Sequence, residues 1–219
     1  MKQFVIFDMD GVLIDSEPLH QLAEKELLKE YGIEVSTEAL LQYMGRSTEA
    51  LLKQFIQNYH LDVDYPRLYQ NHQNHLGTVL ADFVQPIDGI PDFLSELDRY
   101  QIPFAVASSS SLRMIHLVLE KMNWRDRFTV VVSGEEVQQG KPNPDIFLEA
   151  AKRLDATVES CVVVEDSNAG VRAGKAAHMR TIGFKSPHSA QQDISMADFV
   201  INDFSDNTIA QILSWCGIS

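Results

Sequence analysis

Six short apolar runs, spread over most of the chain, constrain the fold more than any other feature of the sequence. β-Branched and aromatic residues dominate these runs, which cover residues 4–7, 104–108, 129–133, 161–165, 180–184 and 198–202. The runs are apolar without strict alternation, which is typical of strands that are covered on both faces of a parallel sheet. Amphipathic segments lie between or after them, near 90–100, 111–123, 144–154, 168–177 and 206–215. This alternation predicts an α/β fold with a doubly wound parallel sheet.

One long interval interrupts the alternation. Residues 16–85 carry no convincing strand pattern and instead predict helices at 18–31, 37–44, 47–59 and 66–81. Tyr31 and Gly32 end the first of these helices, and Ser36 or Thr37 can cap the second. An insert of roughly 70 residues is far longer than an ordinary crossover connection. We therefore expect a core of residues 1–15 and 86–219 and an inserted helical domain of residues 16–85.

The charge balance excludes several classes of function. The net charge is −13 and the isoelectric point is about 4.8, without a dense basic stretch. This disfavours binding to nucleic acid and to anionic membranes. No apolar run reaches the ~18 residues of a membrane-spanning helix, and the N-terminus does not resemble a signal peptide. Cys161 and Cys216 have no metal-type spacing, and a reducing cytoplasm is the simplest setting, so we expect a cytoplasmic protein. We favour a monomer, because the sequence has no unusual apolar surface run.

Polar side chains gather where the predicted strands end. Because ligands of open α/β sheets bind beyond the carboxyl ends of the strands, these side chains are candidates for one site. They are Asp8 and Asp10 after the first strand, Ser108 and Ser109 after the second, Lys141 before the helix near 144, and Glu165 and Asp166 at the end of the fourth strand. Their convergence is more specific than any one motif.

The four carboxylates of this set predict a metal. Asp8 and Asp10 are two residues apart, so they can point to the same side of the chain. Together with Glu165 and Asp166 they bring up to four negative charges together, which raises some of their pKa values unless a cation is present. Mg²⁺ prefers oxygen ligands of this kind.

The remaining groups predict a phosphoryl-transfer site. Lys141 is a point charge that suits phosphate, and Ser108 and Ser109 lie at a helix N-terminus, where anions bind readily. Asp8 is a candidate nucleophile because a carboxylate with an ordinary pKa of about 3.9 is already ionised at neutral pH. Asp10 can protonate the leaving oxygen and later accept a proton from water.

Four motifs in order resemble the haloacid dehalogenase superfamily of phosphotransferases. They are DMDGVL at 8–13, VASSS at 106–110, GKPNPDIF at 140–147 and VVVEDSNAG at 162–170. The insert is similar to the helical cap of the subgroup that contains β-phosphoglucomutase and small sugar-phosphate phosphatases. The resemblance implies a Rossmann-like catalytic core with an inserted α-helical cap domain.

The resemblance also implies roles for the core residues. Asp8 is the implied nucleophile and a Mg²⁺ ligand, and Asp10 is the implied general acid and base, with its backbone carbonyl on the metal. Asp166 is a third ligand, and Glu165 binds the metal directly or supports a ligand. Ser108 and Lys141 hold the phosphoryl group.

The inserted domain carries the implied substrate contacts. Glu17, His20 and Arg46 are the candidates, and the linkers near Asp15–Ser16 and Val84–Pro86 are the implied hinges. Two histidines in the cluster QNHQNH, His72 and His75, have a spacing that suits metal binding, but we favour a solvated helix face.

Three readings of the function follow. The second aspartate, Asp10, argues for phosphate chemistry, because the dehalogenases of the superfamily lack an acid there. Thr48, Gln70 and the pair Ser111–Leu112 stand where the mutase has basic or polar residues that contact a sugar phosphate. We therefore favour a Mg²⁺-dependent phosphatase for a small sugar or polyol phosphate over a β-phosphoglucomutase-type mutase. A phospho-accepting binding module without turnover is the third reading, which the long insert disfavours.

Overall fold

The computed structural model describes residues 2–43, 47–186 and 192–218 and divides the chain into two compact units. We call residues 1–15 and 85–219 the α/β unit and residues 16–84 the helical unit. Gln85 was expected in the inserted domain, but it belongs to the α/β unit, where its carbonyl accepts a hydrogen bond from the backbone N–H of Asp15 at 3.3 Å. No described helix is long and apolar enough to cross a membrane.

The α/β unit contains the predicted sheet, and the predicted fold class is confirmed. Its strands are parallel and lie in the order β3-β2-β1-β4-β5-β6. Their bounds are β1 Phe4–Phe7, β2 Phe104–Ser108, β3 Val130–Ser133, β4 Cys161–Glu165, β5 Arg180–Phe184 and β6 Phe199–Ile201. Each differs from its predicted run by at most one residue at either end, because the apolar runs are the segments that the sheet buries.

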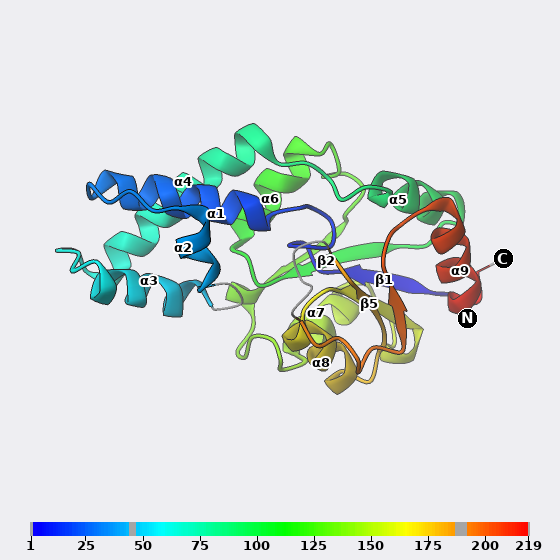
Figure 1. Ribbon diagram of the computed structural model, residues 1–219. Coiled ribbons are helices and arrows are strands. Elements are labelled where there is room, and N and C mark those ends of the chain that lie inside the picture. The colour runs from blue at the N-terminus through cyan, green and yellow to red at the C-terminus, as the bar shows by residue number, and fades with distance from the viewer. Residues whose placement is uncertain (1, 44–46, 187–191, 219) are drawn as a thin grey trace. The chain divides into compact units, whose positions relative to one another are not determined.

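Helices cover both faces of this sheet. They are α5 Ile90–Arg99, α6 Leu112–Lys121, α7 Asp145–Arg153, α8 Asn168–Ala176 and α9 Asp206–Cys216, with short 3₁₀ turns η1 Gly134–Glu136 and η2 Val158–Ser160. In Figure 1, α7 and α8 lie below the strands and α5 and α6 above them. The two-sided cover explains why the strands are apolar without alternation.

Successive residues of β1 enter the two cores. Ile6 packs with Phe147 of α7 and Ala173 of α8 in a cluster on one face of the sheet. Phe7 points the other way, and its ring makes an edge contact with Phe93 of α5 at 5.7 Å between centroids. Both side chains are fully buried. This two-sided burial fixes β1 as the central strand, and whatever follows Phe7 is therefore held at the middle of the sheet edge.

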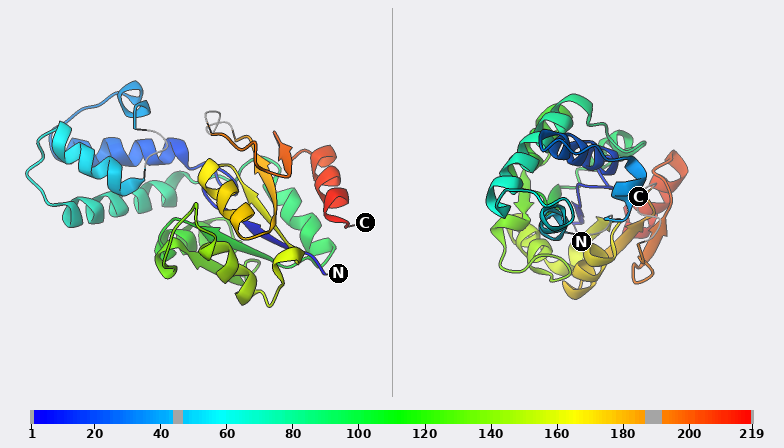
Figure 2. Two further views of the ribbon diagram at one scale, coloured as in Figure 1. Left: turned by 90° about the horizontal axis from the view of Figure 1, so that it is seen from below. Right: turned by 60° about the vertical axis from the view of Figure 1, so that its left-hand side comes forward.

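The helical unit is an all-α structure. Its helices are α1 Glu17–Glu30, α2 Thr37–Leu41, α3 Thr48–Asn58 and α4 Tyr65–Phe83, and α1 and α4 lie side by side in both views (Figure 1, Figure 2). The helices α2, α3 and α4 each have a side-chain cap at the N-terminus. A backbone N–H in the first turn donates to an oxygen of Ser36 in α2, of Ser47 in α3 and of Asp64 in α4. The expected cap at Ser36 is thus confirmed. An apolar and aromatic core that includes Leu28, Phe55 and Leu68 holds the helices together.

Candidate active site

The register of three neighbouring strands aligns the first residues of the site. Phe7 of β1 pairs with Val106 of β2 on one side and with Val164 of β4 on the other. The next residue of each strand path, Asp8, Ala107 and Glu165, therefore lies at one level of the sheet. This level is the carboxyl end of the strands, where ligands of such sheets bind.

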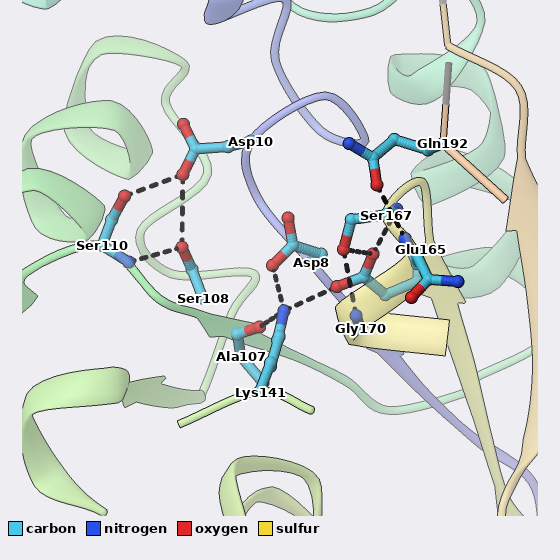
Figure 3. A network of polar contacts seen from close by, with 11 residues as sticks. Asp8, Asp10, Ala107, Ser108, Ser110, Lys141, Glu165, Ser167, Gly170 and Gln192 are labelled. Carbon is cyan, nitrogen blue, oxygen red and sulfur yellow. Dashed lines mark hydrogen bonds and ion pairs between the residues drawn. The ribbon is translucent and has the colours of Figure 1, made fainter. Parts of the chain in front are cut away.

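Lys141 joins these three positions. Its ammonium group contacts the Asp8 carboxylate, donates to Glu165 Oε1 at 2.7 Å and donates to the carbonyl oxygen of Ala107 at 3.2 Å (Figure 3). The side chain of Lys141 is only 6% exposed, and those of Asp8 and Glu165 are 10% and 1% exposed. A buried cation with two carboxylates and a carbonyl is a fixed arrangement, because breaking any pair leaves a buried charge unmatched.

Glu165 is held on its other oxygen by the start of α8. The backbone N–H and the hydroxyl of Ser167 both donate to Glu165 Oε2, at 2.8 and 2.9 Å. The Ser167 hydroxyl accepts in turn from the backbone N–H of Gly170 at 3.0 Å, so Ser167 is also the cap of α8. Gly170 is required here, since a Cβ at that position would lie 1.6 Å from Glu165 Oε1.

Asp166 occupies a second buried position. It is 9% exposed, and its Oδ2 accepts a hydrogen bond from the Ser186 hydroxyl at 3.1 Å. Gly11 follows Asp10 with a positive φ of 76°, and a Cβ on it would lie 2.2 Å from the same carboxylate oxygen. The glycine of the DMDG motif thus permits both the sharp turn and the close approach of Asp166 to the backbone after β1.

Asp10 contacts two hydroxyl groups. Its Oδ2 accepts from the Ser110 hydroxyl at 2.7 Å and from the Ser108 hydroxyl at 3.3 Å (Figure 3). The Ser108 hydroxyl accepts from the backbone N–H of Ser110 at 3.0 Å, which fixes the turn after β2. The two aspartates of one motif therefore have different surroundings, one beside an ammonium and the other beside two hydroxyls.

The electrostatics of the site follow from burial. Burial raises the pKa of Asp8 well above its ordinary value; Lys141 opposes this rise, and Glu165 and Asp10 add to it. Burial by itself lowers the pKa of Lys141, but Asp8 and Glu165 outweigh it and hold that pKa above its ordinary value. Lys141 is therefore a cation at neutral pH. Burial, followed by Glu165, raises the pKa of Asp166 to about 7.

These carboxylates suit a cation that supplements Lys141. The negative charge of Asp10 raises the pKa of both Asp8 and Asp166, so Asp10 interacts electrostatically with each of them. Within residues 2–43, 47–186 and 192–218, however, no three His, Cys, Asp or Glu side chains are arranged to hold a metal ion by themselves. A cation here would bind fewer side chains and complete its shell with backbone, water or substrate oxygens, as Mg²⁺ commonly does.

The structure places the predicted residues in three groups. Lys141 contacts both Asp8 and Glu165, and Asp10 contacts Ser108. Asp166 forms the third group, and Glu165, Lys141 and Asp10 lie close enough to it to shift its pKa. Ser109 follows Ser108 but has an exposed side chain. Glu17 and His20 lie on α1 of the helical unit, and Arg46 lies outside the described residues.

Sequence reasoning missed several polar partners. Ser110, Ser167 and Ser186 hold Asp10, Glu165 and Asp166, and none of them was singled out for this role. A signal was available for the first two, because a serine two residues after a strand-end residue can fold back as a turn or cap. Ser186 follows β5 and is brought to Asp166 by tertiary structure alone.

Comparisons with known proteins agree with this geometry. The family model for haloacid dehalogenase-like hydrolases matches residues 5–184. The chain is 32% identical to the fructose-1-phosphate phosphatase of Escherichia coli, over 81% of this chain and 94% of the relative. It is also 32% identical to the bifunctional riboflavin kinase/FMN phosphatase of Arabidopsis thaliana, over 94% of this chain but 54% of that longer protein.

A solved structure extends the likeness to the fold. The crystal structure of a putative β-phosphoglucomutase from Thermotoga maritima superposes with a TM-score of 0.81 at 26% identity. The match covers 97% of this chain and 99% of that one. The similarity therefore includes both units of the chain.

Proposed function

The chain belongs to the haloacid dehalogenase-like hydrolase family, and we propose that it is a Mg²⁺-dependent phosphatase of small phosphorylated metabolites. The observation that carries the proposal is the different placement of its two motif aspartates. Asp8 is buried against the Lys141 ammonium, whereas Asp10 accepts hydrogen bonds from Ser108 and Ser110. Phosphate ester hydrolysis through a covalent intermediate needs one carboxylate that attacks phosphorus and a second one that transfers protons.

In the first half of the proposed reaction, a carboxylate oxygen of Asp8 attacks phosphorus. An acyl phosphate bond forms on Asp8, the phosphorus–oxygen ester bond breaks, and Asp10 gives its proton to the leaving alkoxide. Lys141 offsets the repulsion between Asp8 and the phosphate dianion, because it is cationic and contacts the attacking group. Ser108 and Ser109 remain the proposed donors to the phosphoryl oxygens.

In the second half, water replaces the alcohol. Asp10, now ionised, accepts a proton from a water molecule as that water attacks the acyl phosphate. The products are inorganic phosphate and the free Asp8 carboxylate. The two hydroxyl groups that bind Asp10 keep its carboxylate at one place for both proton transfers.

A Mg²⁺ ion fits the donor set of this site. Asp8, Asp166 and the backbone carbonyl of Asp10 are its proposed protein ligands. Bound there, the ion would neutralise charge on the transferring phosphoryl group. Glu165 contacts Lys141 and Ser167, so we assign it the role of orienting Lys141. The pKa of Asp166, about 7, favours metal binding at and above neutral pH, since protons compete for that carboxylate below it.

We propose a sugar or polyol phosphate as the substrate. The similarity to the E. coli fructose-1-phosphate phosphatase supports this class of substrate. Glu17, His20 and Arg46 remain the proposed substrate contacts of the helical unit. The two boundaries of that unit, after Asp15 and after Val84, remain the proposed hinges.

The proposal is tested by phosphate release. Purified protein is expected to release phosphate from p-nitrophenyl phosphate with Mg²⁺, and chelation of the metal is expected to abolish release. Asp8→Asn should remove turnover, because the amide is not a nucleophile. Asp155→Asn is the matched control: Asp155 is exposed and has a positive φ of 54°, which asparagine tolerates. Full turnover by Asp8→Asn protein would refute the covalent mechanism.

A mutase is the second candidate, and the fold match to the T. maritima protein favours it. Thr48 and Gln70 argue against it, because both are uncharged where the mutase has a cation. Leu112 argues against it as well, because its apolar side chain replaces an amide of the mutase. The two candidates differ in product. A phosphatase releases phosphate from hexose phosphates, whereas a mutase converts one hexose monophosphate into its isomer with little release.

A further inference from the structure

The connection between β5 and β6 reaches back to the residues that follow β4. Ser186 at its start and residues 192–193 farther on contact the segment 166–168, which we call the Asp166 loop. β5 is a neighbour of β4 in the sheet, and Gly183 pairs with Glu165. The chain that leaves β5 therefore runs beside the chain that leaves β4, at the sheet edge that carries the candidate active site.

Ser186 contacts the carboxylate of the Asp166 loop. Its hydroxyl donates to Asp166 Oδ2 at 3.1 Å, and the two residues are only 5% and 9% exposed. Asp166 Oδ2 also packs against the backbone at Gly11, where a Cβ would lie 2.2 Å from Oδ2 and 3.2 Å from Oδ1. One oxygen of the carboxylate is thus restrained from two sides, and Oδ1 lies farther from the backbone after β1.

The backbone fixes the position of Ser186. The N–H of Lys185 donates to the carbonyl oxygen of Ile201 in β6 at 2.9 Å. The N–H of Ser186 donates to the carbonyl oxygen of Phe184 in β5 at 3.0 Å, which closes a tight turn directly after the strand. Because two strands hold this backbone, the hydrogen bond from the Ser186 hydroxyl restrains the Asp166 carboxylate.

Residues 192–193 hold the other end of the Asp166 loop. Gln192 Oε1 accepts from the backbone N–H of Asn168, the first residue of α8, at 3.1 Å (Figure 3). The side-chain amide of Asn168 donates to the carbonyl oxygen of Asp193 at 2.7 Å. The first N–H groups of a helix have no acceptor within the helix, so Gln192 supplies one for Asn168. Both ends of the Asp166 loop therefore have partners in the connection between β5 and β6.

The orientation of a carboxylate matters when it binds a metal. Groups that hydrogen-bond to metal ligands orient those ligands, and their removal weakens metal binding. Mg²⁺ is demanding in this respect, because it requires nearly ideal octahedral geometry. Ser186 meets the description of such a group, since it binds one oxygen of Asp166 and is not itself among the proposed ligands.

We propose that Ser186 is a positioning residue for the metal site: its hydroxyl fixes Asp166 through Oδ2 and leaves Oδ1 to bind Mg²⁺. Gln192 and Asp193 support this arrangement, because they hold the start of α8. The proposal deepens the proposed function and rests on it in one respect, namely that Asp166 is a Mg²⁺ ligand. A hydroxyl that only satisfied a buried carboxylate would contribute to folding stability but not to metal affinity.

The test is Mg²⁺ binding to the full-length protein without substrate, measured by isothermal titration calorimetry. We expect Ser186→Ala protein to bind Mg²⁺ about 10–100-fold more weakly than the unmodified protein, because Asp166 loses the group that orients it. Urea unfolding in the absence of Mg²⁺ shows whether the variant is folded under the conditions of the titration. An unchanged dissociation constant for Mg²⁺ in folded Ser186→Ala protein overturns the proposal.

Ser195→Ala is the matched control. Ser195 belongs to the same connection, but it is exposed, and its contact with Asp193 Oδ1 at 3.0 Å comes from the backbone N–H, which the substitution keeps. We expect an unchanged dissociation constant for Mg²⁺ in this variant. A loss of affinity equal to that of Ser186→Ala would mean that any change in the connection weakens the site, and it would overturn the specific role of Ser186.

Ser186→Cys covers the case in which Ser186→Ala protein does not fold. A thiol is a weaker hydrogen-bond donor than a hydroxyl, so we expect a smaller loss of Mg²⁺ affinity in the same direction. No loss of affinity in folded Ser186→Cys protein would then overturn the proposal.

The unmodified protein separates this inference from the proposed function. If it binds Mg²⁺ and releases phosphate, while Ser186→Ala protein binds Mg²⁺ equally well, the role of Ser186 alone is wrong. If the unmodified protein binds no Mg²⁺, the metal of the proposed function is wrong, and the role of Ser186 is overturned with it.

Discussion

The α/β unit and the helical unit both bury ionisable side chains, but they compensate the cost of burial in different ways. In the α/β unit, Lys141 contacts Asp8 and Glu165, and serine hydroxyls take up further carboxylate oxygens. In the helical unit, burial shifts Glu24 and His72 toward their neutral forms. Pairing fixes the positions of charges, which suits chemistry at one atom. A buried group without such a pair instead changes its protonation with pH, as Glu24 does near its pKa of about 7.

The largest expected effect comes from breaking the pairing. Lys141→Met leaves Asp8 and Glu165 buried without their cation, and we expect it to lower the free energy of unfolding by about 3–5 kcal/mol at pH 8. The loss should be smaller at pH 5, because the carboxyl groups can then take up protons. Lys152→Met, at a side chain that is 78% exposed, should cost less than about 1 kcal/mol. Urea unfolding at both pH values measures these differences, and equal costs for the two variants would contradict a structural role of the pairing.

Asp10→Ala separates acid catalysis from nucleophilic attack. We expect turnover of an alkyl phosphate to fall by about 10²–10⁴-fold, because the poor leaving group is no longer protonated. Loss of p-nitrophenyl phosphate turnover should be smaller, since nitrophenolate leaves readily without a proton. Steady-state rates with both substrates give the comparison. Identical losses would show that Asp10 does not act on the leaving group.

Gly170→Ala tests how closely the paired site is packed. A Cβ at Gly170 would lie 1.6 Å from Glu165 Oε1, so Glu165 must move and Lys141 loses a fixed partner. We expect a loss of about 1–3 kcal/mol in the free energy of unfolding. Gly140→Ala is the control, because a Cβ there would meet no heavy atom within 4 Å. Thermal melting of both variants measures the effect, and a Gly170→Ala protein as stable as the control would mean that the site adapts freely.

The smallest expected effect concerns Glu24 in the helical unit. The pKa of Glu24 is about 7 in the folded protein against an ordinary value of 4.5, so the folded state binds more protons than the unfolded state between these pH values. The stability that this group contributes is complete below pH 4.5 and is lost as the pH rises to about 7. Glu24→Gln removes this dependence, and at pH 8 it should be more stable than the unmodified protein by roughly 1–2 kcal/mol, with little difference at pH 4.5. Melting curves across this range check the slope, and parallel pH profiles would contradict it.

The α/β unit could be predicted closely because its signals are local. Strands buried on both faces must be apolar throughout, and the carboxyl end of a parallel strand is where polar groups such as Asp8 and Glu165 become tolerable. The polar side chains after the first, second and fourth strands therefore indicated which edge of the sheet carries the site. The fold, the strand bounds and the grouping of Asp8, Lys141 and Glu165 could be predicted from the sequence.

The rest depends on tertiary contacts that leave weaker traces. Four consecutive serines, 108–111, look equivalent in sequence, and only the turn after β2 makes Ser110 the stronger partner of Asp10. His72 lies among asparagine and glutamine residues that are usually exposed, and its burial follows from the packing of α4 on α1. The prediction that His72 is exposed was wrong, because a polar residue at a buried helix position does not add to the apolar periodicity that indicates burial.

The three-strand level of Asp8, Ala107 and Glu165 has a consequence for protein synthesis. Lys141 is 133 residues from Asp8 along the chain and 24 residues before Glu165. Asp8, the proposed nucleophile, is therefore made before Lys141 and before β4, the strand that completes its surroundings. Until β4 pairs with β1, Asp8 has no defined neighbour on that side, so nascent chains that end before residue 161 should bind neither metal nor phosphate. Contacts this distant in sequence form slowly during folding.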